Sequence, residues 1–392
     1  MARWLVIAIG LLGLCWPIGC GDSKYDNYTL MRIVPHNTQH LEELARLHDD
    51  PEGVEILKRS HGLNDTTDVL VSPNKSVFLE ELVAKSGMPV QYKYNYGRLG
   101  KRIVSISTQL TKITNYINEL GTRAPDMVTV QNVGQSYNGR KMQLVKISTN
   151  PRGRNPVIFI DAGIHAREWV APAMAMYLIH RLTNDPKARQ RELNGVDWYI
   201  LPNRLWRKTR SKSSPNNCFG VDGNRNYGFK WGVSGVSNNP CDPETYAGSQ
   251  PFSEVETQIV RNIMMENQQR LKLYVSLHSY GQYLVYPWGY TADVLPRDWK
   301  KLHNLARMVS DSVVRAGGRP FNVMSAGQWY PAAGGSDDFA FGVVGVPYSY
   351  TMELTDGYEF TFPDKLLRVV LPQFYDGFIT FSAQIKREFG QS

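Results

Sequence analysis

The sequence predicts an α/β protein in which a mixed sheet carries helices on both faces, preceded by a small open α/β sandwich. Apolar strands alternate with long helices after residue 108, which is typical of such a sheet. Shorter strand and helix patterns occur before residue 100. The length of 392 residues fits one large domain and one smaller domain.

The first segment, residues 1–21, is predicted to be a cleaved signal peptide. Arg3 precedes an apolar run from Leu5 to Leu14 that is too short to span a bilayer, and Pro17 follows it. An interfacial helix or a lipid-modified Cys20 is the alternative, although Pro17 fits a lipidation motif poorly. We therefore expect a secreted, extracellular protein.

Residues 22–102 are predicted to form the small sandwich. Strands are expected at 28–34 and 68–71, and helices at 40–47 and 76–86. The acceptor sites for N-glycosylation, at Asn27, Asn64 and Asn74, all lie in this part. The basic stretch 97–102 reads as an exposed processing linker, with Arg98 or Arg102 as the cleavage site.

Residues 103–392 are predicted to form the large domain. Its elements are expected in the order helix 108–120, strands 142–148 and 156–162, helix 169–183, strand 196–201, helix 252–269, strand 271–278, helix 298–316, strand 346–353 and helix 364–387. Polar side chains fall at or just past the ends of three strands. In open α/β sheets the space beyond the carboxyl ends of the strands is where ligands bind.

Composition and charge favour no unusual class of protein. Hydrophobic residues make up 42% and charged residues 20%, and the net charge of +8 is spread along the chain. We therefore expect no nucleic-acid partner, no membrane span and a monomer.

The cysteines predict one disulfide. Cys15 and Cys20 fall in the signal segment, and Cys218 and Cys241 have no partner at the spacing of a metal site. A bridge between the latter two would contribute roughly 3 kcal/mol by closing a loop of about 24 residues.

A metal site is predicted where the apolar strand 156–162 runs into His165-Ala166-Arg167-Glu168-Trp169. Spacing of three lets His165 and Glu168 face one point. Zinc at catalytic sites takes three protein ligands, and His278 at the end of another strand is a candidate for the third. A core histidine bonded to the backbone is the alternative for His278.

Five motifs together resemble the pancreatic-type carboxypeptidases A and B, in that family's order and over residues 108 to 387. They are the run 165–169, Arg204-Leu205-Trp206-Arg207-Lys208-Thr209-Arg210, Gly220-Val221-Asp222-Gly223-Asn224-Arg225-Asn226, His278-Ser279-Tyr280-Gly281-Gln282 and Tyr350-Thr351-Met352-Glu353-Leu354. The N-terminal part resembles that family's activation segment in size and placement. The resemblance implies an eight-stranded carboxypeptidase-like sheet and a secreted zinc exopeptidase made as a precursor, inhibited by its own propeptide until a trypsin-like protease cleaves it.

The resemblance also assigns roles to individual residues. It implies one zinc ion held by His165, Glu168 and His278, with Glu353 as general base toward water. Asp222 would orient a ligand histidine, and Arg207 would stabilise the developing oxyanion.

The remaining roles concern peptide C-termini, the expected substrates. Asn224 and Arg225 would bind the terminal carboxylate, with Arg167 assisting, and Tyr280 is a further candidate substrate contact. Tyr330 matches the family's mobile tyrosine. The bottom of the specificity pocket falls on Asp337, which would favour C-terminal Lys or Arg; otherwise Asp337 turns to solvent and Asp338 only caps a helix.

The chain departs from the family between Pro202 and Asn203, where members carry about a dozen further residues. Loss of this loop could displace Arg204 and Arg207, and a shift of about 1 Å can slow catalysis by about two orders of magnitude. The chain would then be a mis-assembled version of an active enzyme or an impaired isoform. Binding of zinc and peptide C-termini without efficient turnover, or a scaffold role without metal, are the alternative functions.

Overall fold

The computed structural model describes residues 29–45, 53–58, 63–64, 67–95, 110–165, 167–202, 208–213, 218–357 and 362–390. The predicted signal peptide, the processing linker, Asn27, Arg204 and Arg207 lie outside these residues. The chain divides into two compact units, residues 1–90 with 94–98, and residues 91–93 with 99–392.

The N-terminal unit is a four-stranded sheet with two helices. Its strands are β1 (Thr29–Ile33), β2 (Val54–Lys58), β3 (Thr67–Val71) and β4 (Val90–Asn95), in the order β2-β3-β1-β4, and its helices are α1 (Thr38–Ala45) and α2 (Pro73–Ser86). Alternate residues of β1 and β3 pack against both helices in one small core, which includes Ile33, Val69, Leu44 and Leu79. The predicted sandwich is present, with two strands, β2 and β4, that the sequence pattern did not indicate.

The C-terminal unit is built on an eight-stranded mixed sheet, ordered β13-β12-β14-β11-β7-β8-β6-β5. The strands are β5 (Val128–Gln135), β6 (Lys141–Ile147), β7 (Val157–Ala162), β8 (Asp197–Pro202), β11 (Leu271–Ser279), β12 (Tyr283–Tyr286), β13 (Asn322–Ser325) and β14 (Tyr348–Leu354). The four central strands β14, β11, β7 and β8 are parallel, and antiparallel pairs flank them. Almost every residue of β7, β11 and β14 is buried, which explains why these strands are continuous apolar runs in the sequence.

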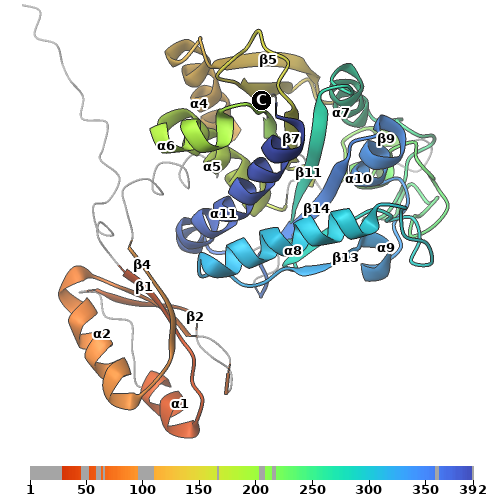
Figure 1. Cartoon of the computed structure of the whole chain (residues 1–392). Helices are drawn as coiled ribbons and strands as arrows, with labels where there is room; N and C mark the ends of the chain where they lie inside the picture. The colour runs from red at the N-terminus through yellow and green to blue at the C-terminus, as the bar shows by residue number, and fades with distance from the viewer. Residues whose placement is uncertain are drawn as a thin grey trace, which may run out of the picture. The chain divides into compact units, whose positions relative to one another are not determined.

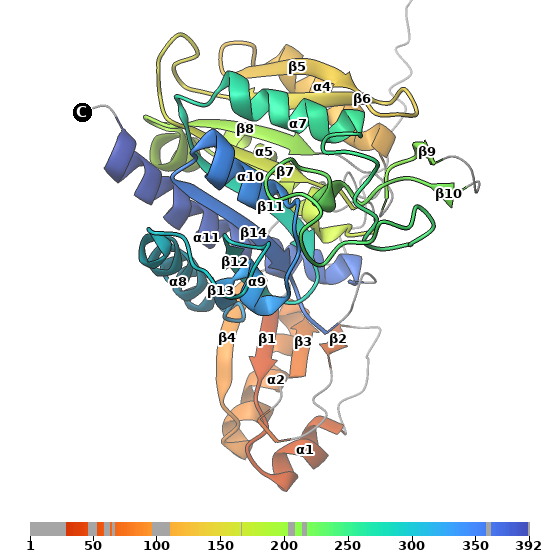
Figure 2. The ribbon, with the colours of Figure 1, turned by 90° about the vertical axis from the view of Figure 1, so that its right-hand side faces the viewer.

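Helices cover both faces of this sheet, as predicted (Figures 1 and 2). One core lies under α4 (Leu110–Arg123), α5 (Val170–Asn184), α8 (Trp299–Arg315) and α11 (Asp364–Phe389). A second core, on the opposite face, lies under α7 (Val255–Glu266) and the segment that contains α10 (Ser336–Phe339). Within the described part of the chain, no helix is both long and apolar enough to span a bilayer.

The smaller elements lie in the connections. They are α6 (Pro186–Ala188), the π-helical turn η2 (Arg189–Leu193), the short pair β9 (Lys212–Ser213) and β10 (Cys218–Phe219), the 3-10 turn η3 (Gly223–Arg225), α9 (Ala326–Trp329) and the π-helical turn η4 (Ala340–Val344). The expected helix 252–269 is shorter at both ends, because Phe252 has a left-handed φ of 55° and Asn267 ends the helical backbone.

Candidate metal centre and substrate cavity

The three predicted metal ligands meet at the carboxyl ends of two central strands. His165 and Glu168 lie in the turn between β7 and α5, and His278 is the second-last residue of β11. The Glu168 backbone N–H donates to the His165 carbonyl at 3.1 Å, which turns both side chains the same way. All three side chains are buried, at 3%, 3% and 1% exposure.

Their donor atoms converge on one point. His165 Nδ1 is 2.8 Å from Glu168 Oε1, His278 Nδ1 is 3.0 Å from Glu168 Oε2, and the two Nδ1 atoms are 3.2 Å apart. Two imidazole lone pairs directed at each other repel unless a proton or a cation lies between them. Four ligands around zinc at about 2.0–2.1 Å would be about 3.3 Å apart, close to these spacings. The donor set and its spacing therefore fit zinc.

The charges at this point are tightly coupled. Burial by itself would raise the pKa of Glu168, but the charges and hydrogen bonds of His165 and His278 outweigh burial and hold the pKa at about 2. Glu168 is therefore a carboxylate over the whole physiological range. It supplies the anionic oxygen that a divalent cation requires.

Asp222 lies behind the first histidine. Its Oδ1 is 2.9 Å from His165 Nε2, and the Asp222 side chain is fully buried. A carboxylate on the far nitrogen of a ligand histidine fixes the ring and leaves Nδ1 for the metal. The Asp222 backbone N–H donates to the Tyr246 carbonyl at 2.9 Å, which fixes the chain at this point.

A cavity of about 370 Å³ brings together five of the predicted site residues: Asn224, Arg225, Tyr330, Asp337 and Glu353. Glu353 is the register partner of His278 on the neighbouring strand β14. Adjacent strands are about 4.8 Å apart, so Glu353, which lines the cavity, is also a close neighbour of a predicted metal ligand.

Asn224 and Arg225 are held rigidly by their neighbours. Asn224 Oδ1 accepts from the backbone N–H and the hydroxyl of Ser336 at 3.1 and 3.3 Å, which leaves the amide NH₂ to donate to a ligand. Arg225 donates through Nη1 to the Asn224 carbonyl at 3.0 Å and through Nε to the Gly235 carbonyl at 3.2 Å. Among the described residues, Nη2 has no acceptor. This buried guanidinium can therefore still donate to a carboxylate.

The two neighbouring aspartates differ in their surroundings. Asp338 accepts from the backbone N–H groups of Gly289 and Tyr290 at 2.8 and 3.0 Å. Asp337 is 4% exposed and lines the cavity, and its Oδ2 has no hydrogen-bond partner in the part of the chain that the structure describes. Burial raises the pKa of the Asp337 carboxyl. Asp337 therefore does not turn to solvent.

The other predicted substrate residues are placed differently. The Tyr330 ring is half exposed and lies 5.9 Å from the Arg225 guanidinium carbon. Arg167 makes a two-pronged ion pair with Glu244, at 3.0 and 2.5 Å, and neither Arg167 nor Tyr280 lines the cavity. The structure thus groups Tyr330, but not Arg167 or Tyr280, with the cavity residues.

Cys218 and Cys241 form the predicted disulfide. Arg207 lies outside the described residues, but the residue after it, Lys208, forms an isolated β-bridge with Asp222. The Thr209 backbone N–H donates to the Val221 carbonyl at 2.8 Å. The chain that follows the shortened loop is therefore anchored beside the metal centre.

Several polar partners of these residues were not predicted from the sequence. Ser276 Oγ lies 3.0 Å from His278 Nε2, Ser336 orients Asn224, and Thr351 lines the cavity beside Asp337. A period of two along a strand places Ser276 and His278 on one face, so this pair had a detectable signal. No sequence signal pointed to Ser336, because its role depends on a contact with Asn224, which lies 112 residues away in the chain.

Comparison with known families gives two matches along the chain. Residues 113–389 match the zinc carboxypeptidase model, and residues 31–94 match the carboxypeptidase activation peptide. The chain belongs to the zinc carboxypeptidase family. It is the zymogen of a zinc metallocarboxypeptidase, and His165, Glu168 and His278 form a buried group that could hold the metal ion.

Individual relatives agree with this assignment. Carboxypeptidase B of Astacus astacus is 40% identical over 271 aligned positions, covering 65% of this chain and 88% of the relative. Zinc carboxypeptidase A 1 of Anopheles gambiae is 32% identical over 388 positions, covering 90% and 88%. The crystal structure of thrombin activatable fibrinolysis inhibitor superimposes with a TM-score of 0.68 at 25% identity, covering 92% of this chain and all of that chain.

The alignment with the Astacus astacus enzyme contains gaps in this chain. If this chain had a residue at each of the 271 aligned positions, the alignment would cover more than 65% of its 392 residues. The alignment therefore contains positions at which this chain has no residue. The family assignment does not favour the alternatives of peptide capture without turnover or a metal-free scaffold.

Proposed function

We propose that this chain is a secreted zymogen whose activated form removes Lys or Arg from the C-termini of peptides. The observation that carries the preference is the buried Asp337 oxygen, which lacks a partner in the same cavity as Arg225 and Glu353. A buried carboxylate with an unpaired oxygen favours a cationic side chain in its cavity over an apolar one.

The cavity supports a complete arrangement for recognising a C-terminal residue. Arg225 and the NH₂ group of Asn224 would bind the free carboxylate, and Asp337 would pair with the side chain. Tyr330 would close over the bound residue. An internal residue of a peptide has no carboxylate for Arg225, so the enzyme would act on chain ends.

The peptide bond would then lie between Glu353 and the metal ligands. When bound, zinc supplies a Lewis acid that polarises the carbonyl and lowers the pKa of water. Glu353 would take a proton from the attacking water and pass it to the leaving amine. Asp222 would hold the His165 ring, and Arg207 would stabilise charge on the carbonyl oxygen.

The shortened loop is compatible with this role for Arg207. Lys208 is bridged to Asp222, which itself contacts His165. The described chain after the loop therefore starts next to a residue that contacts a predicted zinc ligand.

Secretion is supported by two features of the chain. Residues 1–21 have the pattern of a signal peptide. The Cys218–Cys241 disulfide forms and persists in oxidising compartments.

The proposal is tested with the trypsin-treated protein and blocked dipeptides that differ only in their last residue. We expect chelator-sensitive release of Arg and Lys, with kcat/KM about two to three orders of magnitude above that for Leu or Phe. Asp337→Asn should remove most of this advantage and leave cleavage of the Leu substrate unchanged, which makes Leu the internal control.

Two results would count against the proposal in different ways. A wild-type preference for Leu or Phe, or an Arg preference that survives Asp337→Asn, would reject the basic specificity. Failure to release any C-terminal residue from protein shown to contain zinc would reject turnover itself.

A further inference from the structure

His278, the second histidine of the metal site, contacts a serine hydroxyl, whereas His165 contacts a carboxylate directly. Ser276 Oγ lies 3.0 Å from His278 Nε2, and both residues are 1% exposed. They alternate with Leu277 along β11, so their side chains share one face of the sheet. The contact is therefore built into the strand.

The direction of this hydrogen bond follows from the metal site. His278 Nδ1 faces the ligand cluster, 3.0 Å from Glu168 Oε2. An imidazole that binds a metal through Nδ1 is neutral and carries its proton on Nε2. Nε2 must then donate to Ser276 Oγ, so the serine hydroxyl has to donate its own proton to another acceptor.

Asp161 is the acceptor beside that hydroxyl. It is the register partner of Ser276 on the adjacent parallel strand β7, and its side chain is 4% exposed. Burial raises the pKa of the Asp161 carboxyl, whereas a hydrogen bond from Ser276 and the nearby charges of His278 and His165 lower it. Register pairing on adjacent strands therefore places the Ser276 hydroxyl beside the Asp161 carboxylate, which can accept a hydrogen bond from it.

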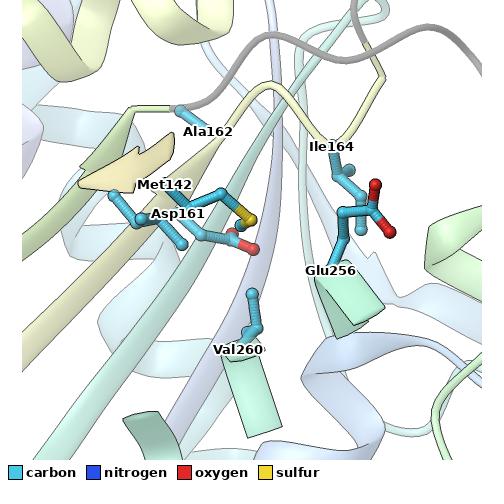
Figure 3. Close-up of a pocket in the computed structure, with 7 residues that line it drawn as sticks. Met142, Asp161, Ala162, Ile164, Glu256 and Val260 are labelled. Atoms are coloured by element: carbon cyan, nitrogen blue, oxygen red, sulfur yellow. The ribbon is translucent and has the colours of Figure 1, made fainter. Parts of the chain in front are cut away.

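The surroundings of Asp161 offer the carboxylate few other partners. It lines a cavity of about 280 Å³ with Met142 and Val260, and Figure 3 shows Asp161 with Met142 on one side and Glu256 with Ile164 on the other. Within the described part of the chain, Asp161 Oδ1 has no hydrogen-bond partner, and Glu256 accepts from the Tyr137 backbone at 2.9 Å. Ser276 and Tyr274 are the neighbouring hydroxyl groups that lower the pKa of this buried carboxyl, and Ser276 is the one that also contacts His278.

We propose that Ser276 and Asp161 are positioning residues that fix the proton and ring orientation of His278, as Asp222 does directly for His165. The hydrogen-bond chain runs from His278 Nε2 to Ser276 and from Ser276 to Asp161. The two histidines of the metal site then have different partners. Asp222 accepts directly from His165, whereas Ser276 accepts from His278 and donates to Asp161. Outer partners of this kind typically strengthen metal binding by about 10- to 100-fold.

The test is the zinc affinity of the full-length protein, measured by competition with a chelating dye in the absence of peptide. Ser276→Ala should weaken zinc binding by about 10- to 100-fold, because the Nε2 proton loses its acceptor. Ser276→Thr keeps a hydroxyl and should restore affinity. Asp161→Asn keeps the shape and an acceptor oxygen but loses the charge, so zinc binding should also weaken.

Ser382→Ala is the matched control. Ser382 is equally buried, and its hydroxyl makes a single hydrogen bond, to the Glu192 carbonyl at 3.0 Å, away from the metal ligands. This variant should bind zinc like the wild type. The melting temperature of each metal-free variant separates a weaker site from a damaged fold.

A spectroscopic measurement adds a readout that a packing role would not move. In the cobalt-substituted protein, Ser276→Ala should change the visible absorption bands, because the orientation of a ligand ring changes, whereas Ser382→Ala should leave them unchanged. Wild-type zinc affinity and unchanged cobalt bands in Ser276→Ala would overturn the proposal. If Ser276→Ala weakens zinc binding and Asp161→Asn does not, Asp161 has no part in positioning His278. None of these measurements depends on the C-terminal specificity proposed above.

Discussion

Glu353, near the end of β14, and Glu168, in the turn after β7, are both buried glutamates, but their neighbours give them different chemistry. Glu168 is held between two histidines, whereas Glu353 faces the cavity that contains Arg225 and Asp337. A carboxylate placed beside two imidazole nitrogens completes a set of metal donors, while one at the edge of a cavity can exchange protons with a ligand.

Glu353→Gln should therefore greatly decrease turnover, but the protein should still bind zinc. We expect kcat to fall by about 10²- to 10⁴-fold, since an amide cannot accept the proton. Zinc content, measured by elemental analysis, should stay at one ion per chain. Glu388→Gln, a matched change at a residue paired with Lys301, should have wild-type kcat, and a Glu353→Gln enzyme with wild-type kcat would exclude the general-base role.

The specificity should depend on pH through Asp337. Burial raises the pKa of its carboxyl, which is ionised above that pKa and neutral below it. As the pH falls through the raised pKa, the carboxylate loses its charge and its attraction for a cationic side chain.

The ratio of kcat/KM for an Arg substrate to that for a Leu substrate should thus decrease on acidification, starting above the usual Asp value of about 3.9. Taking a ratio cancels pH effects on zinc binding that both substrates share. A ratio that stays constant until the enzyme is inactivated would mean that Asp337 does not contact the substrate.

At the scale of elements, the polar ends of β7, β11 and β14 meet because these strands are parallel neighbours. Parallel strands end at the same edge, so residues far apart in sequence come together there. The long segment between β8 and β11 adds Asp222, Asn224 and Arg225 to that edge. This segment has few regular elements, and the disulfide is one of its fixed points.

Removing the disulfide should destabilise the C-terminal unit. Cys218→Ser with Cys241→Ser opens a loop with a sequence separation of 23 residues, which costs about 3 kcal/mol in the chain-entropy model. The melting temperature should fall by about 6 to 12 °C, measured by calorimetry. Dithiothreitol should lower the melting temperature of the wild type to a similar degree and leave the double variant unaffected.

At the scale of the whole molecule, the chain joins a separately folded activation peptide to the enzyme. We expect this segment to inhibit the full chain, since a tethered segment acts at a local concentration of about 1 mM. Cleavage in the stretch 97–102, which lies outside the described residues, would release it.

Trypsin treatment should therefore raise activity against a C-terminal Arg substrate as the full-length band disappears on a gel. A variant with Arg98→Gln, Lys101→Gln and Arg102→Gln should resist both changes. If the intact wild-type chain is already as active as the cleaved one, the segment is not an inhibitor. If the triple variant is activated normally, cleavage occurs elsewhere.

The predicted elements were confirmed where apolar patterns are long. The four central strands and helices α5, α8 and α11 were all expected, because buried strands and amphipathic helices leave strong periodic signals. Strands β5, β12 and β13 were not expected. They lie at or near the edges of the sheet, where one side of a strand carries polar residues and the signal is weak.

The sequence by itself determined the candidate metal ligands, since His165 and Glu168 follow one apolar strand, His278 lies near the end of another, and their donor atoms suit zinc. Only the tertiary structure decided that Asp337 lines the cavity and that Ser276 pairs with Asp161 on the adjacent strand. It also decided that Asp338 accepts from the backbone N–H groups of Gly289 and Tyr290. The physical reason is that donor chemistry and strand periodicity are local properties of a sequence, whereas burial and pairing depend on which distant segments the sheet brings together.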